Sequence, residues 1–231
     1  MNNEYKKIWG NRYFLSPDTK NWKPFKGWDK EDRKHLVLLI IIKKEDIVKK
    51  IEMVQHKLSL HNSYIRFPKR YYHVTLKPLG FLDDLKKHLD DYSKKELDEI
   101  IKNIERVLLK ESKFKLELKS VNLFKDAVFI EIDDKNKLTS INKKILNIPK
   151  INALKRDYPN FLPHCSIGTY RSNKIKDLIG EIKNFREFSF GKMVIDRIQL
   201  VIAHWHNTKY PKFEIIKSFR LKKKSLSVFG S

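Results

Sequence analysis

Two short stretches of this sequence alternate apolar and polar residues and place a histidine two residues before a hydroxyl side chain. They are 71–80, with His73 and Thr75, and 161–170, with His164 and Ser166. In a half-buried β-strand, side chains alternate between the two faces, so each histidine shares a face with its hydroxyl. An imidazole and a hydroxyl in that arrangement can both bind phosphate oxygens, and the neutral imidazole can accept a proton.

Sequence context separates these two copies from the other matches to His-x-Ser/Thr. The pattern occurs four times, whereas roughly one match is expected by chance in a chain of this length. The copies that begin at His61 and His206 lie in polar, turn-like sequence with no alternating strand around them. The copies at His73 and His164 lie on predicted strands and follow lead-ins rich in aromatic residues and proline. We therefore predict one general acid/base site; its catalytic residues are His73, Thr75, His164 and Ser166.

The first motif resembles that of a known family. Residues 73–80 read His-Val-Thr-Leu-Lys-Pro-Leu-Gly, which is similar to the first motif of the 2H phosphoesterase superfamily. The similar branch is that of 2′-5′ RNA ligases and RNA 2′,3′-cyclic phosphodiesterases (LigT-like). The second motif, residues 164–167, keeps the His/hydroxyl pair but lacks the arginine that often follows it in the family. Arg171 is the nearest substitute, and the resemblance covers about residues 35–221.

The resemblance implies a fold and an activity. The fold is α+β: two pseudo-symmetric lobes of antiparallel-rich sheet, with helices outside and a central cleft to which each lobe contributes one His-x-Thr/Ser strand. The order of predicted strands and helices also favours two similar lobes. The implied activity is metal-independent opening of 2′,3′-cyclic phosphate ends to 2′-phosphates, and in reverse 2′-5′ RNA ligation, with no cofactor. Sequence does not decide which histidine is the base and which the acid.

Two other functions remain open. The same cleft would suit a non-catalytic nucleotide- or RNA-binding module, although a binding module has no need of two titrating groups around one phosphate. It would also suit a phosphodiesterase that acts on 2′-5′ oligoadenylate or on RNA 3′ ends. In each case the expected partner is RNA or a nucleotide with a 2′,3′-cyclic phosphate or a 2′-5′ linkage.

Four further side chains are candidates for substrate binding. Tyr71 and Tyr170 share the predicted faces of the two histidines, so we expect them to stack on bases or simply to flank the cleft. Lys77 and Arg171 are candidates for phosphate contacts, although lysine is common throughout this chain. Cys165 alternates with its two neighbours and should face the core, which favours a packing role over a nucleophilic one.

Composition and length divide the chain into three parts. Residues 1–34 form an aromatic and basic extension, 35–221 the phosphoesterase-like domain, and 222–231 a basic tail. The net charge of +22 would attract a polyanion such as RNA, but lysine-rich codon bias explains it equally well. Aromatic residues among lysines in 1–34 suit either packing against the domain or stacking on RNA, and we favour packing.

Metal binding and membrane insertion are both disfavoured. His204-Trp205-His206 is the main competing constellation, but a zinc site requires three or four ligands and the sequence nominates no others. We therefore predict no metal. The sequence has no eighteen-residue apolar run and no N-terminal signal core, so we expect a cytoplasmic protein without membrane contact, acting as a monomer.

Overall fold

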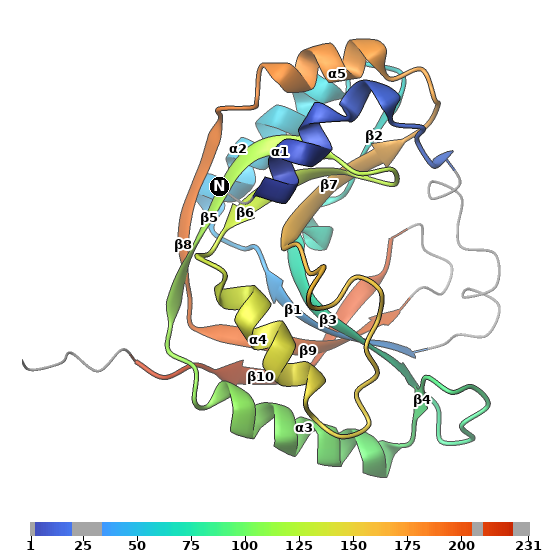
Figure 1. Cartoon of the computed structure of the whole chain (residues 1–231), viewed down its shortest axis with the longest axis vertical. Coiled ribbons are helices and arrows are strands. Elements are labelled where there is room, and N and C mark those ends of the chain that lie inside the picture. The colour runs from blue at the N-terminus through green and yellow to red at the C-terminus, as the bar shows by residue number, and fades with distance from the viewer. Residues whose placement is uncertain (1–2, 20–33, 205–209, 224–231) are drawn as a thin grey trace, which may run out of the picture.

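Two five-stranded sheets form the framework of the molecule, and each contains one His-x-Thr/Ser strand (Figure 1). The computed structural model describes residues 3–19, 34–204 and 210–223. The fold is α+β and its sheets are antiparallel except for one short parallel pair, so the predicted fold class is confirmed.

The first sheet holds the strand that begins at His73. Its order is β10 (Lys212–Arg220), β9 (Arg197–His204), β1 (Lys34–Ile41), β3 (His73–Leu82) and β4 (Asp91–Tyr92). The second sheet holds the strand that begins at His164. Its order is β2 (Tyr64–Arg66), β7 (His164–Tyr170), β6 (Val128–Asp133), β5 (Phe114–Leu123) and β8 (Ser189–Ile195). In the first sheet β3 pairs antiparallel with β1, and in the second sheet β7 pairs antiparallel with β6. In the sequence, a helix lies between the two strands of each pair.

Five α-helices in the described part of the chain pack on the two sheets (Figure 1). They are α1 (Asn3–Gly10), α2 (Glu45–Leu58), α3 (Lys94–Leu108), α4 (Lys137–Leu146) and α5 (Lys176–Lys183). Helix α2 follows β1 of the first sheet but packs, with α5, on the second; α4 follows β6 of the second sheet but packs, with α3, on the first. Each lobe is therefore completed by a helix from the other half of the chain.

A local sequence signal marks the start of α3, where Ser93 and Glu96 form a capping box. Residues 193–203 alternate like a single strand but belong to two, because the chain breaks at Asp196, so that β8 lies in the second sheet and β9 in the first. Residues 80–82 read as a turn from their glycine, but β3 continues to Leu82. No helix among the described residues is long and apolar enough to cross a bilayer.

The N-terminal extension packs on the second sheet where the structure describes it. Helix α1 lies against β5, and the Tyr5 side chain is only 2% exposed. Trp9 is half-buried between the guanidinium groups of Arg12 and Arg186, which lie 4.4 and 4.6 Å from its ring centroid. These contacts agree with the favoured packing role. Trp22, Phe25 and Trp28 lie outside the described residues.

Candidate active site

The two predicted strands bring their histidines together where the two sheets meet. The backbone of His73 contacts the Cys165 sulfur, and the pKa of His73 is lowered in part by the charge of His164. A cavity of about 770 Å³ opens at this point, a size typical of ligand sites. The residues of its lining that concern the site are Thr75, Phe124, Asp126, Arg156 and His164.

Each imidazole is held by a hydrogen bond from its Nδ1 to a backbone carbonyl two residues earlier in the chain. Nδ1 of His73 lies 2.6 Å from the carbonyl oxygen of Tyr71, and Nδ1 of His164 lies 2.9 Å from that of Leu162. A carbonyl only accepts, so each Nδ1 carries a proton and each Nε2 is the basic atom of the neutral ring. Nε2 of His73 lies 3.1 Å from Oγ1 of Thr75, which donates to it. The predicted partnership of histidine and hydroxyl is therefore present on β3.

Aromatic rings surround both histidines. The His73 ring packs edge-on against Tyr71 and Phe213, with centroids 4.8 and 5.0 Å apart. The His164 ring packs in the same manner against Phe124 and Phe129, at 4.8 and 5.5 Å. Removal of water by these rings disfavours the charged imidazolium.

This burial lowers the pKa values of both histidines. Burial lowers the pKa of His73 to about 4, and the hydrogen bond to the Tyr71 carbonyl only partly opposes the effect. Burial also lowers the pKa of His164, but there the Asp126 carboxylate acts in the opposite direction and favours the charged form. The two histidines thus differ in that one of them faces a carboxylate.

The low pKa of His73 predicts a pH dependence of stability. Between pH 4 and its ordinary pKa near 6.5, this histidine binds more protons in the unfolded chain than in the native protein. Stability therefore rises with pH: the contribution is complete above about pH 6.5 and is lost as the pH falls toward 4. The free energy of unfolding should fall between pH 7.5 and 5.0 in the wild type. We expect this fall to be smaller in His73→Asn, by up to about 2 kcal/mol. Urea unfolding at both pH values tests this, and equal losses in wild type and variant would contradict it.

Each catalytic strand has a β-bulge directly after its hydroxyl residue. In β3 the extra residue is Leu76, which follows Thr75. In β7 it is Ile167, which follows Ser166. A bulge opposes two residues to one and changes which face the later side chains occupy. The two His-x-Thr/Ser-bulge segments are thus equivalent in register as well as in sequence.

A buried amide side chain binds the carbonyl of each bulge. Nδ2 of Asn142, on α4, donates to the Leu76 carbonyl at 2.9 Å. Nε2 of Gln55, on α2, donates to the Ile167 carbonyl at 2.7 Å. Each donor comes from the helix supplied by the other half of the chain, and both side chains are almost fully buried. The Ile167 carbonyl also accepts the Phe67 amide at 2.9 Å and the Tyr64 hydroxyl at 2.8 Å. The two amide side chains thus tie each bulge to the helix that packs on it.

The bulges explain two wrong predictions. Simple alternation would place Lys77 and Tyr170 in the cleft, but each follows a bulge and is buried in the core instead. The Lys77 ammonium is fully buried and pairs with Asp157 at 2.6 Å, so it is not available to a phosphate. The Tyr170 hydroxyl donates to the backbone carbonyls of Phe124 and Ala127, at 2.9 and 3.2 Å, and its ring cannot stack on a base.

The position of Arg171 also contradicts the prediction. It is exposed at the far end of β7, where its amide donates to the Ser63 carbonyl, roughly 20 Å along the strand from His164. Arg156 lines the cavity instead, close enough for its charge to lower the pKa of His164. It comes from the connector before β7, which no strand pattern would have located. Asp126, in the β5–β6 turn, was missed for the same reason.

The remaining predicted residues lie near the site. Ser166 is half-buried two residues after His164 on β7, with no bulge between them. Tyr71 ends a short 3-10 helix and contacts His73 rather than lying on β3. His204, proposed as half of a competing zinc pair, lies 2.7 Å from the Glu214 carboxylate, whereas His206 lies outside the described residues. The described residues contain no cluster of three or more His, Cys, Asp or Glu side chains that would hold a metal.

The chain is similar to known proteins in sequence and in fold. A family model described as the 2′-5′ RNA ligase superfamily matches residues 44–206. An RNA 2′,3′-cyclic phosphodiesterase of Aquifex aeolicus is 24% identical over 156 residues, which covers 64% of this chain and 77% of that protein. Among solved structures, the protein TT0787 of Thermus thermophilus has a TM-score of 0.61 at 16% identity, covering 82% of this chain and 99% of its own. E. coli LigT complexed with NADP+ has a TM-score of 0.61 at 13% identity, covering 83% and 99%.

Proposed function

The chain belongs to the 2′-5′ RNA ligase superfamily, and from that premise we propose that it is a metal-independent phosphoesterase that opens 2′,3′-cyclic phosphate ends of RNA to 2′-phosphates. The observation that carries the proposal is the pair of equivalent histidine strands at one cleft. Each histidine holds its Nδ1 proton on a backbone carbonyl, which leaves Nε2 as the reactive atom. The name of the similar Aquifex aeolicus protein refers to the same substrate class.

The reaction requires a base and an acid on opposite sides of one phosphorus atom. The oxygen of a water molecule attacks phosphorus, the bond from phosphorus to the 3′ oxygen breaks, and the phosphate stays on the 2′ oxygen. One imidazole takes a proton from the water while the other gives one to the 3′ oxygen. With an RNA 5′-hydroxyl in place of water, the same transfers would join the two strands through a 2′-5′ linkage.

We assign the base to His73 and the acid to His164. With a pKa of about 4, His73 is neutral at pH 7. Its Nε2 accepts a hydrogen bond from the Thr75 hydroxyl, and it becomes available to the attacking water when that hydroxyl turns to a phosphate oxygen. Burial and the charge of Arg156 lower the pKa of His164, but the Asp126 carboxylate in the same cleft opposes them and favours the imidazolium that an acid requires. A bound phosphate would add a negative charge that favours the same charged form.

Three other groups would hold the phosphate. The Thr75 and Ser166 hydroxyls lie beside the two imidazoles and would donate to the non-bridging oxygens as charge develops there. Arg156 lines the same cavity and makes no ion pair with any residue that the structure describes. Its guanidinium is suited to bind two phosphate oxygens at once.

A short RNA with a 2′,3′-cyclic phosphate end, incubated with the protein in EDTA, tests the proposal. We expect multiple turnovers without added metal and a product that carries a 2′-phosphate and a free 3′-hydroxyl, identified by ³¹P NMR. A 3′-phosphate product would show that the 2′ oxygen leaves and would contradict the proposed reaction. Turnover that requires a divalent metal would contradict the two-histidine mechanism.

A further inference from the structure

Helix α1 forms part of the wall of the active-site cleft. Glu4, Lys7 and Ile8 line the same cavity as Thr75 and His164. Their spacing of three and four residues places all three side chains on one face of the helix. The family match begins at residue 44, so this wall lies outside the part of the chain that defines the family.

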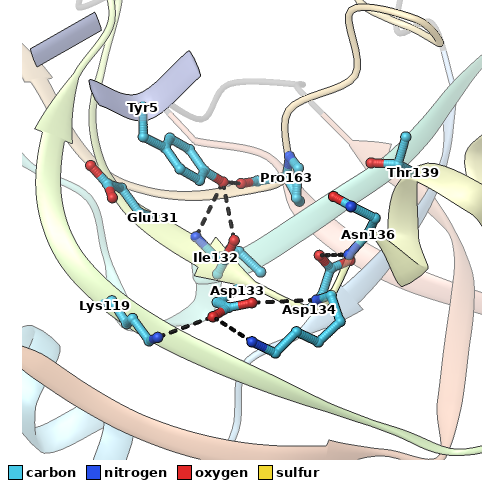
Figure 2. A pocket seen from close by; sticks show the side chains of 10 residues that line it. Tyr5, Lys119, Glu131, Ile132, Asp133, Asp134, Asn136, Thr139 and Pro163 are labelled. Carbon is cyan, nitrogen blue, oxygen red and sulfur yellow. Dashed lines mark hydrogen bonds and ion pairs between the residues drawn. The ribbon is translucent and has the colours of Figure 1, made fainter. Parts of the chain in front are cut away.

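The wall is fixed to the backbone beside His164 (Figure 2). The buried Tyr5 hydroxyl donates to the carbonyl of Pro163, the residue directly before His164. The same oxygen accepts the Ile132 amide at 3.2 Å, and Nδ2 of Asn122 donates to the Tyr5 carbonyl at 3.0 Å. These bonds join α1 to β5, β6 and the start of β7. Side chains on the cleft face of α1 therefore have a defined position relative to the second histidine.

Lys7 is the cation that this wall presents to the cleft. Its side chain is exposed and makes no ion pair with a described residue, whereas Glu4 on the same face has an interaction of its own. Lys7 enters the cavity from α1, whereas Arg156 comes from the connector that leads into β7. The cavity therefore has a second cation, which a different element supplies. A second cation suits a second phosphate of the RNA backbone rather than the cyclic one.

We propose that α1 is an RNA-binding wall in which Lys7 binds the phosphodiester on the 5′ side of the nucleotide that carries the cyclic phosphate. This inference rests on the proposed function and adds a preference for RNA ends. A cyclic mononucleotide has no such phosphodiester, so Lys7 adds nothing to its affinity. Any longer RNA has the phosphodiester and gains affinity from Lys7. A contact to the backbone phosphate carries no base specificity.

The test compares adenosine 2′,3′-cyclic phosphate with an adenylyl dinucleotide that ends in a 2′,3′-cyclic phosphate. Lys7→Ala should lower kcat/KM for the dinucleotide about tenfold through a higher KM, with kcat unchanged. It should not affect the mononucleotide. The slope of log KM for the dinucleotide against log salt should also fall by about 0.7. Lys6→Ala is the matched control, since Lys6 is exposed but does not line the cavity, and Lys7→Arg should retain the preference.

Two results would overturn the inference: equal losses on both substrates, or no loss on either. Failure of the proposed function would appear separately, as a wild-type protein that hydrolyses neither substrate. In that event the affinity of the protein for the 3′-phosphorylated dinucleotide, measured by calorimetry and compared with its affinity for adenosine 3′-phosphate, tests the role of the wall. Weaker dinucleotide binding in Lys7→Ala but not in Lys6→Ala would support the wall, and equal binding in the two variants would overturn it.

Discussion

Alanine at either His73 or His164 is expected to lower kcat for cyclic phosphate opening between about a hundredfold and ten-thousandfold. Each substitution removes one of the two proposed proton transfers and leaves the proposed phosphate ligands, Arg156 and the two hydroxyls, in place. KM should therefore change much less than kcat. The kcat of the double variant should be only slightly lower than that of the less active single variant. The base and the acid act as a unit, so loss of either one already disables the pair.

The sequence offers a matched control for this experiment. His61 begins another His-x-Ser tripeptide, but its loop leads into β2, next to the end of β7 that lies far from His164. His61→Ala should keep wild-type activity. Turnover at the wild-type rate in both His73→Ala and His164→Ala would place the chemistry elsewhere and contradict the site. The pH profile tests the assignment of roles: the limb at low pH reports the base and should be the one that His73→Ala abolishes.

The placement of the two His/hydroxyl pairs was predictable because it depends on short-range alternation. His73 and Thr75 lie on one regular segment of strand, as do His164 and Ser166, and a period of two is sufficient to place them. The α+β class followed from the family resemblance and from the order of the predicted strands and helices. The meeting of the two strands came only from the family resemblance, because no local pattern specifies contacts between residues 73 and 164.

The wrong predictions for Lys77 and Tyr170 have one physical cause, which is the loss of register at a bulge. Alternation holds up to Thr75 and Ser166 and fails directly beyond them, so Lys77 and Tyr170 were placed on the wrong face. A signal for the bulges was nevertheless present in the sequence. Gln55 and Asn142 each occupy the middle of an apolar i, i+4, i+7 stripe, Ile51–Leu58 in α2 and Leu138–Ile145 in α4. A buried amide requires a partner, and an irregular strand that packs on the helix provides one.

The largest change in stability is expected from the buried pair of Lys77 and Asp157. Both side chains are fully buried, and Asp157 also accepts from Nδ2 of Asn142 at 3.1 Å and from the amide of Leu154 at 2.7 Å. Lys77→Ala would leave the Asp157 carboxylate without a countercharge, which costs about 3–5 kcal/mol. The free energy of unfolding, measured by urea denaturation, should fall by that amount.

A double substitution separates this structural role from a role in binding. Lys77→Met with Asp157→Leu removes both charges at once, and replacement of a buried pair by apolar residues is often close to neutral. We expect it to recover most of the stability that Lys77→Ala loses. If Lys77 instead bound a phosphate, Lys77→Ala would leave stability near the wild-type value and raise KM for both cyclic substrates.

The same pair also positions the active site, because Asp157 directly follows Arg156. Its bonds to Lys77 on β3 and Asn142 on α4 hold the connector that presents the Arg156 guanidinium to the cleft. In the double variant, the folded protein should therefore have a kcat close to the wild-type value, because the histidines are intact. Its KM should be higher, because Arg156, the proposed phosphate ligand, is less well held. Full recovery of both stability and KM would show that the connector is positioned by its other contacts, and that Lys77 contributes to stability alone.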